Sequence, residues 1–143
     1  MLDIPIMGVN APKAHQRIIA ILTYKLYDLY VKGFIKYEPL PETMVDESKT
    51  SATPDILLFD NITETNVMMI EVTIPVSEKD DFKKVKEICN RYDIKEGFTY
   101  NYRVQKWRKY RLGEGEILDT PSFCDVVGYD LNDFIEINGK KMA

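Results

Sequence analysis

The segment "TPDILLFDNITETNVMMIEVT", residues 53–73, decides the fold because it sets two carboxylates against two apolar runs. Asp55 stands at the start of the first run, and Glu71 stands inside the second. Runs that are apolar on both faces are typical of strands in the middle of a sheet, and the short polar "DNITETN" between them predicts a hairpin. If residues 54–60 pair with residues 67–74, the hairpin brings both carboxylates to one end of the sheet.

Two explanations account for this pair of carboxylates. Carboxylates that converge repel each other and resist ionisation unless a cation neutralises them, and hard oxygen ligands favour Mg²⁺ or Mn²⁺. The alternative is that Asp55 begins its strand in solvent and that Glu71 pairs with a nearby lysine or arginine. Residue chemistry by itself leaves both explanations open.

The remaining elements predict a mixed α/β arrangement with a sheet between helices. Apolar residues at helical spacing predict amphipathic helices over 13–32 and 77–94. Besides the hairpin, strands are expected within residues 33–42, 96–104 and 106–112, and a further short one around 44–46 in a mainly polar loop. The end of the chain, 124–137, predicts a strand, a turn and a short helix capped by Asp130.

Length and composition predict one domain, residues 1–143, because 143 residues that are 45% hydrophobic suit a single core. No apolar stretch is long enough for a membrane span and the N-terminus has no export-signal pattern, so we expect a cytoplasmic protein with no membrane partner. Cys89 and Cys124 lack metal-ligand spacing, and His15 is the one histidine. A zinc site is therefore not expected.

A net charge of −4 gives no general attraction to nucleic acid, so binding would need a local basic patch. The run "RVQKWRKYR", residues 103–111, interleaves cations with Trp107 and Tyr110, a composition suited to phosphate contacts and base stacking. The alternative is a strand edge that its charges protect from pairing with other chains. The candidate nucleic-acid-binding residues are Arg103, Lys106, Arg108 and Lys109.

The hairpin resembles the PD-(D/E)XK nuclease superfamily, through "PD" at residues 54–55 and "EVT" at residues 71–73. The resemblance implies a restriction-endonuclease-like core of α-β-β-β-α-β order, here with extra C-terminal strands. It also implies that Asp55, Glu71 and the backbone carbonyl of Val72 hold Mg²⁺ or Mn²⁺ for hydrolysis of phosphodiester bonds, with DNA as the partner. The superfamily places a water-orienting lysine two residues after the glutamate, where this chain has Thr73.

The longer stretch "IEVTIPVSEKDDFKKVKEICNRYDIKEGF" is similar, without gaps, to the Uma2-type branch of that superfamily. The matching positions are Glu71, Val72, Pro75, Asp81, Ile94, Glu96 and Phe98. His15 in the first helix and the ending "CDVVGYDLNDFI" extend the similarity over roughly residues 12–136. The lysine that this branch carries on its second helix would align with Val85.

Helix geometry identifies which lysines could replace the missing one. At 100° per residue, Lys86 and Lys84 lie on opposite flanks of the apolar face of the second helix, whereas Lys83 points into water. A flanking lysine can bend its stem over the core toward a carboxylate. We predict Lys86 first and Lys84 second as catalytic residues, with no catalytic lysine as the alternative. Asp81 either complements the helix dipole or joins the metal ligands.

Three functions are compatible with these observations. The first is a Mg²⁺-dependent endonuclease, and the second is a catalytically degenerate nuclease-fold protein that acts by binding. The third is an α/β binding domain without a metal. A homodimer is also compatible with this fold, and we expect the aromatic residues near Tyr100, Tyr102 and Trp107 to be exposed and able to serve it.

Overall fold

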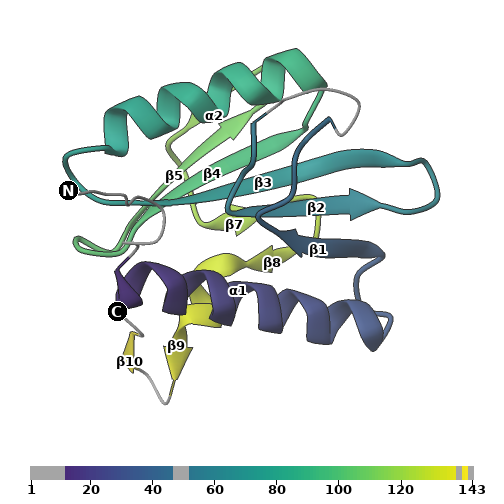
Figure 1. The fold of residues 1–143 in the computed structure, drawn as a ribbon, viewed down its shortest axis with the longest axis horizontal. Coiled ribbons are helices and arrows are strands. Elements are labelled where there is room, and N and C mark those ends of the chain that lie inside the picture. The colour runs from purple at the N-terminus through teal and green to yellow at the C-terminus, as the bar shows by residue number, and fades with distance from the viewer. Residues whose placement is uncertain (1–11, 47–51, 138–139, 142–143) are drawn as a thin grey trace, which may run out of the picture.

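The computed structural model describes residues 12–46, 52–137 and 140–141. A six-stranded mixed sheet forms its centre, with the strand order β1-β2-β3-β4-β5-β6. Figure 1 labels the first five of these strands. Neighbouring strands are antiparallel except β3 and β4, which are parallel. The strands are β1 (Tyr37–Pro41), β2 (Ile56–Asp60), β3 (Thr65–Thr73), β4 (Glu96–Asn101), β5 (Lys106–Arg111) and β6 (Gly115–Ile117).

Two helices lie on opposite faces of the sheet, as Figure 1 shows: α1 (Lys13–Val31) and α2 (Glu78–Tyr92). Alternation along β2 explains why its sequence is apolar throughout, because successive side chains point to opposite faces. Ile56 and Leu58 join the core beneath α1, whereas Leu57 joins the core beneath α2. The predicted α/β fold and the α-β-β-β-α-β order of its first six elements are confirmed.

The helix α2 packs closely on β4 at Gly97. A Cβ atom at this position would lie 2.4 Å from Val85 Cγ1 and 2.7 Å from Cys89 Sγ, so only glycine fits without a shift. The absence of a side chain therefore sets the height of α2 above the sheet. This distance matters for the site, since α2 carries Asp81 and Lys84.

The C-terminal part closes the core on the α1 side. It contains β7 (Phe123–Cys124), β8 (Tyr129–Asp130), a 3₁₀ helix η2 (Leu131–Ile135), β9 (Glu136–Ile137) and β10 (Lys140–Lys141). The predicted cap on the short helix is present, because the Asp130 side chain accepts a hydrogen bond from Asn132 N. Leu131 and Ile135 are fully buried in the same core as α1.

A buried ion pair attaches this part to the sheet. Lys109 Nζ lies 3.0 Å from Glu96 Oε2, and the two residues are only 1% and 2% exposed. Lys109 also donates to Phe123 O at 2.7 Å and to Asp125 Oδ2 at 3.0 Å. Glu96 accepts from the backbone nitrogens of Asp125 and Val126. Strands β4 and β5 therefore hold residues 123–126 through a charged network inside the protein.

Two expectations about local structure were wrong. The segment 43–46 forms no strand, and its Val45 is instead held by a hydrogen bond from Val45 N to Ala52 O. The aromatic residues Tyr100, Tyr102 and Trp107 are 0%, 6% and 6% exposed, so they belong to the core and cannot form a dimer surface.

Candidate active site

Strands β2 and β3 bring Asp55 and Glu71 side by side at one end of the hairpin. Ile56 pairs with Ile70, so Asp55, which precedes β2, lies opposite Glu71. Asp55 N donates to Glu71 Oε1 at 2.7 Å, and Val72 N donates to Asp55 Oδ2 at 2.8 Å. Each carboxylate is thus oriented by a backbone amide of the other strand. The convergence expected from the hairpin is observed.

Burial makes ionisation of Glu71 costly. Burial is the larger cause and the nearby charge of Asp55 the second, and together they raise the pKa of Glu71 from 4.5 to about 8. Among the described residues, no lysine or arginine nitrogen lies within ion-pair distance of Glu71. The Asp55 side chain is 18% exposed, so it does not stand in open solvent. The geometry therefore favours the first explanation, two converging carboxylates whose repulsion a cation would relieve.

His15, in the first turn of α1, contacts Asp55 and Val72 from the face of the sheet that α1 covers. Its Nε2 donates to Val72 O at 3.1 Å and lies 3.6 Å from Asp55 Oδ2. The ionic contact with the Asp55 carboxylate raises the pKa of His15 to about 9, although partial burial opposes this shift. The imidazolium thus partly offsets the negative charge of the two carboxylates. Sequence spacing could not predict that His15 lies in the site, because α1 and β3 are far apart in the sequence.

Thr73, which occupies the position of the superfamily's lysine, holds Asp81 instead. The Thr73 hydroxyl donates to Asp81 Oδ2 at 2.6 Å, and Thr73 is 2% exposed. On the other side of Asp81, Lys84 Nζ lies 4.0 Å from Oδ1. The ammonium of Lys84 also opposes the upward shift of the Glu71 pKa. Thr73 contacts Asp81, and Asp81 contacts Lys84. Through these contacts a lysine lies near the carboxylates of Asp55 and Glu71, although Thr73 itself is not a lysine.

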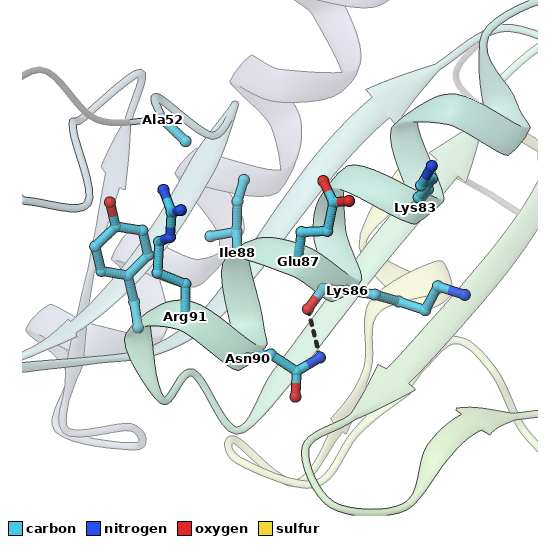
Figure 2. A pocket seen from close by; sticks show the side chains of 8 residues that line it. Ala52, Lys83, Lys86, Glu87, Ile88, Asn90 and Arg91 are labelled. Carbon is cyan, nitrogen blue, oxygen red and sulfur yellow. Dashed lines mark hydrogen bonds between the residues drawn. The ribbon is translucent and has the colours of Figure 1, made fainter.

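Lys86, the first choice from helix geometry, lies on the other flank of α2. Its ammonium is 5.6 Å from the centre of the Phe82 ring, on the side of the helix where Arg108 also packs on that ring. Lys86 lines an open groove of about 1020 Å³ along α2. Figure 2 shows its side chain among those that line this groove. The groove is lined by Ala52, Lys83, Lys86, Glu87, Ile88, Asn90, Arg91 and Tyr92, and includes neither Asp55 nor Glu71. The geometry therefore favours Lys84 over Lys86, the reverse of the predicted order.

The basic run 103–111 is divided by the fold. Lys109 points inward into the ion pair with Glu96, so its expected role in binding nucleic acid is wrong. Arg108 forms two hydrogen bonds with Glu116 and stacks 4.1 Å from the Phe82 ring centre. Lys106 stays exposed beside Glu78, at 3.2 Å, and Arg103 is exposed in the turn before β5.

The donor set fits a hard divalent cation held by few protein ligands. Asp55 and Glu71 each use one oxygen in the hydrogen bonds described above, and the second oxygen of each makes none with another described residue. The Val72 carbonyl adds a third oxygen. Within the described part of the chain, no group of three His, Cys, Asp or Glu side chains could hold a metal ion by itself. Mg²⁺ needs no such cluster, since it usually binds through one or two carboxylates, waters and substrate oxygens.

Solved structures share this fold. One is a candidate nuclease belonging to DUF820 from Anabaena variabilis, with a TM-score of 0.64 and 15% sequence identity over 87% of this chain and 81% of that chain. Another is the type IIG restriction endonuclease BpuSI, with a TM-score of 0.54 and 13% identity over 82% of this chain but only 15% of that chain. No family model and no curated protein sequence matches the chain. The chain therefore has a restriction-endonuclease-like fold, and the predicted resemblance is confirmed at the level of the fold.

The search for membrane spans gives one further finding. None of the helices in the described ranges combines the length and apolar character that a bilayer crossing needs.

Proposed function

We propose that this chain is a Mg²⁺- or Mn²⁺-dependent endonuclease that hydrolyses phosphodiester bonds, with DNA as its expected substrate. The observation that carries the proposal is the pair of hydrogen bonds that locks Asp55 and Glu71 together at the end of the central hairpin. A protein gains no stability by burying two like charges side by side, so a functional reason for the pair is needed. Both structural neighbours are described as nucleases, which supports phosphodiester hydrolysis as that reason.

In this proposal, Asp55, Glu71 and the Val72 carbonyl hold the cation. A divalent cation at this place supplies activation of a water molecule and stabilisation of the negative charge that grows on the phosphate. The amide of Asp55 orients the Glu71 carboxylate, and the amide of Val72 orients the Asp55 carboxylate. His15 holds the Val72 carbonyl in place. We assign Asp81 to positioning rather than to metal binding, since the Thr73 hydroxyl holds one of its oxygens and the Lys84 ammonium lies 4.0 Å from the other.

We assign the missing lysine's role to Lys84. Its side chain is 57% exposed, so its stem is free to swing from Asp81 toward a phosphate that approaches Asp55 and Glu71. An ammonium there would orient the attacking water and balance charge in the transition state. For contacts with the nucleic-acid backbone we retain Arg103 and Lys106, which are exposed. A cytoplasmic location stays a prediction.

The test is cleavage of supercoiled plasmid and single-stranded DNA with Mg²⁺ or Mn²⁺. Asp55→Asn should lower the rate by about 100-fold or more, because it removes a charged ligand. The matched control is Asp60→Asn, which changes a solvent-exposed carboxylate at the other end of β2. Cleavage that persists unchanged in Asp55→Asn would refute the site. If the wild-type chain cleaves neither the plasmid nor the single-stranded DNA, the proposed activity is refuted.

A second pair of variants tests the lysine. Lys84→Met should reduce cleavage by about 100-fold, a typical size for loss of a group that assists proton transfer. Lys86→Met makes the same chemical change on the opposite flank of α2 and should leave the rate within about twofold. Equal losses in the two variants, or a loss in Lys86→Met alone, would contradict the assignment.

The second candidate function is a nuclease-fold protein that binds without cutting. The observation in its favour is Thr73, because its hydroxyl is engaged with Asp81 and cannot replace an ammonium. This candidate predicts DNA binding without cleavage under every metal condition.

A further inference from the structure

The outer face of α1 carries an apolar stripe that no other residue within 12–46, 52–137 and 140–141 covers. Ala20, Tyr24, Tyr27 and Val31 follow one another at steps of four, three and four. The large side chains among them are 66%, 48% and 59% exposed, in chain order from Tyr24. This spacing is the one that helices use to pack against another helix.

The stripe lies opposite the face that α1 uses for the core. The buried residues of α1 are Ile18, Ile19, Leu22 and Leu26, about 160° around the helix from the centre of the stripe. The helix is thus apolar on two faces, and one protein core accounts for only one of them. From the exposed fractions, and about 200 Å² for a large side chain, the stripe presents about 350 Å² of surface. A continuous apolar patch of this size is often an interaction site.

A groove beside the stripe has the shape to receive its own side chains. The groove measures about 480 Å³ and runs between α1 and the end of β1. Ala20, Tyr24 and Tyr27 all line it, so a small side chain stands beside two large ones. A surface with a projecting aromatic next to a hollow of this kind can be complementary to itself.

Charge favours an antiparallel arrangement of two copies. Arg17 and Asp28 flank the stripe on the same side, about 50° and 70° from its centre. An antiparallel pair centred between Thr23 and Tyr24 sets Tyr27 of one copy against Ala20 of the other. It also brings Arg17 near the opposite Asp28, whose Oδ2 pairs with Lys32 of its own helix at 3.0 Å and would be shared between the two cations. The two-fold axis repeats this ion pair. In a parallel pair the charged flank would instead meet the uncharged flank, which carries Gln16 and Thr23.

We propose that the outer face of α1 is a homodimer interface in which two α1 helices pack antiparallel across a two-fold axis. Two stripes together bury about 700 Å² before their flanks are counted, which is below the range of stable, specific interfaces. The dimer is therefore a reversible one, with an expected Kd of about 1–100 µM. This inference is independent of the proposed nuclease function, and Asp55→Asn should dimerise like the wild-type chain.

Sedimentation velocity of the full chain, from about 1 µM to about 500 µM, tests the proposal. The wild-type chain should shift from monomer to dimer, and Tyr24→Asp should stay monomeric at the highest concentration. Ile62→Asp is the matched control, because Ile62 is 85% exposed in the turn between β2 and β3. Circular dichroism melts verify that both variants fold. A monomeric wild type, as expected if another segment or protein covers the stripe, or a dimer that survives Tyr24→Asp, would overturn the proposal.

Cysteine cross-linking tests the antiparallel geometry. Tyr24→Cys lies near the axis and should form an interchain disulfide on oxidation, whereas Val31→Cys lies about 20 Å from its counterpart and should not. The native Cys89 and Cys124 are buried and are not expected to react. Cross-linking of Val31→Cys with the same efficiency as Tyr24→Cys would refute the antiparallel packing.

Discussion

Replacing Glu71 with glutamine should stabilise the folded chain at alkaline pH while it removes a proposed metal ligand. Glutamine keeps an oxygen for the hydrogen bond from Asp55 N, at 2.7 Å in the wild-type chain, and carries no charge. The substitution therefore removes the cost of ionising a buried carboxyl beside Asp55 and leaves the local geometry intact. Substitutions in functional sites commonly raise the free energy of unfolding in this way, because residues needed for function are often unfavourable for stability.

The size and sign of the effect follow from the pKa of Glu71. Its value is about 8 in the fold and 4.5 ordinarily, so the folded chain binds this proton more tightly than the unfolded chain. The stabilisation by the neutral carboxyl is complete below pH 4.5 and is lost as the pH rises toward 8. At about 1.4 kcal/mol per pH unit, the loss reaches up to about 5 kcal/mol above pH 8. Relative to wild type, Glu71→Gln should be almost neutral at pH 5 and should gain that amount by pH 9.

Urea unfolding measured between pH 5 and pH 9 in the presence of a chelator checks this expectation. The fluorescence of Trp107, the one tryptophan, reports the transition because its ring is buried. His15 also loses a proton toward pH 9, but this loss occurs in both proteins and cancels in their difference. Glu87→Gln, at an exposed position of α2, is the control and should show no pH-dependent gain. Parallel pH profiles for wild type and Glu71→Gln would refute the reasoning.

Two stability predictions concern the packing around the site. Gly97→Ala should cost about 1–3 kcal/mol in urea unfolding, because its Cβ would lie 2.4 Å from Val85 Cγ1, and adding Val85→Ala should recover part of that loss. Lys109→Met should cost about 3–5 kcal/mol by leaving the Glu96 carboxylate buried without its cation. Lys106→Met, on the exposed side of the same strand, should stay within about 0.5 kcal/mol, and equal losses at both lysines would contradict the buried ion pair.

The hairpin and its carboxylates were predictable because the information is local. Two apolar runs joined by a short polar turn leave few ways to pair, and the spacing from Asp55 to Glu71 matches the hairpin register. The two helices followed from their periodicity in the same way. The proximity of the two acids therefore needed no knowledge of the rest of the fold.

Contacts between distant elements could not be read from the sequence. Helix geometry places Lys84 and Lys86 symmetrically about the apolar face of α2, and only the order of the strands beneath decides which flank faces Glu71. His15 joins the site through the packing of α1 on the sheet. Lys109 belongs to a run that resembles a solvated surface, and only its distant partner Glu96 explains why it is buried.

Binding of Mn²⁺ by the chain tests the central claim most directly. Electron paramagnetic resonance counts free Mn²⁺, so titration of wild type, Asp55→Asn and Asp60→Asn measures binding without requiring a substrate. The account predicts that Mn²⁺ binds to the wild-type chain and to Asp60→Asn, and that binding is lost in Asp55→Asn. Equal binding by all three proteins, or no binding by the wild-type chain, would contradict a metal site at Asp55 and Glu71.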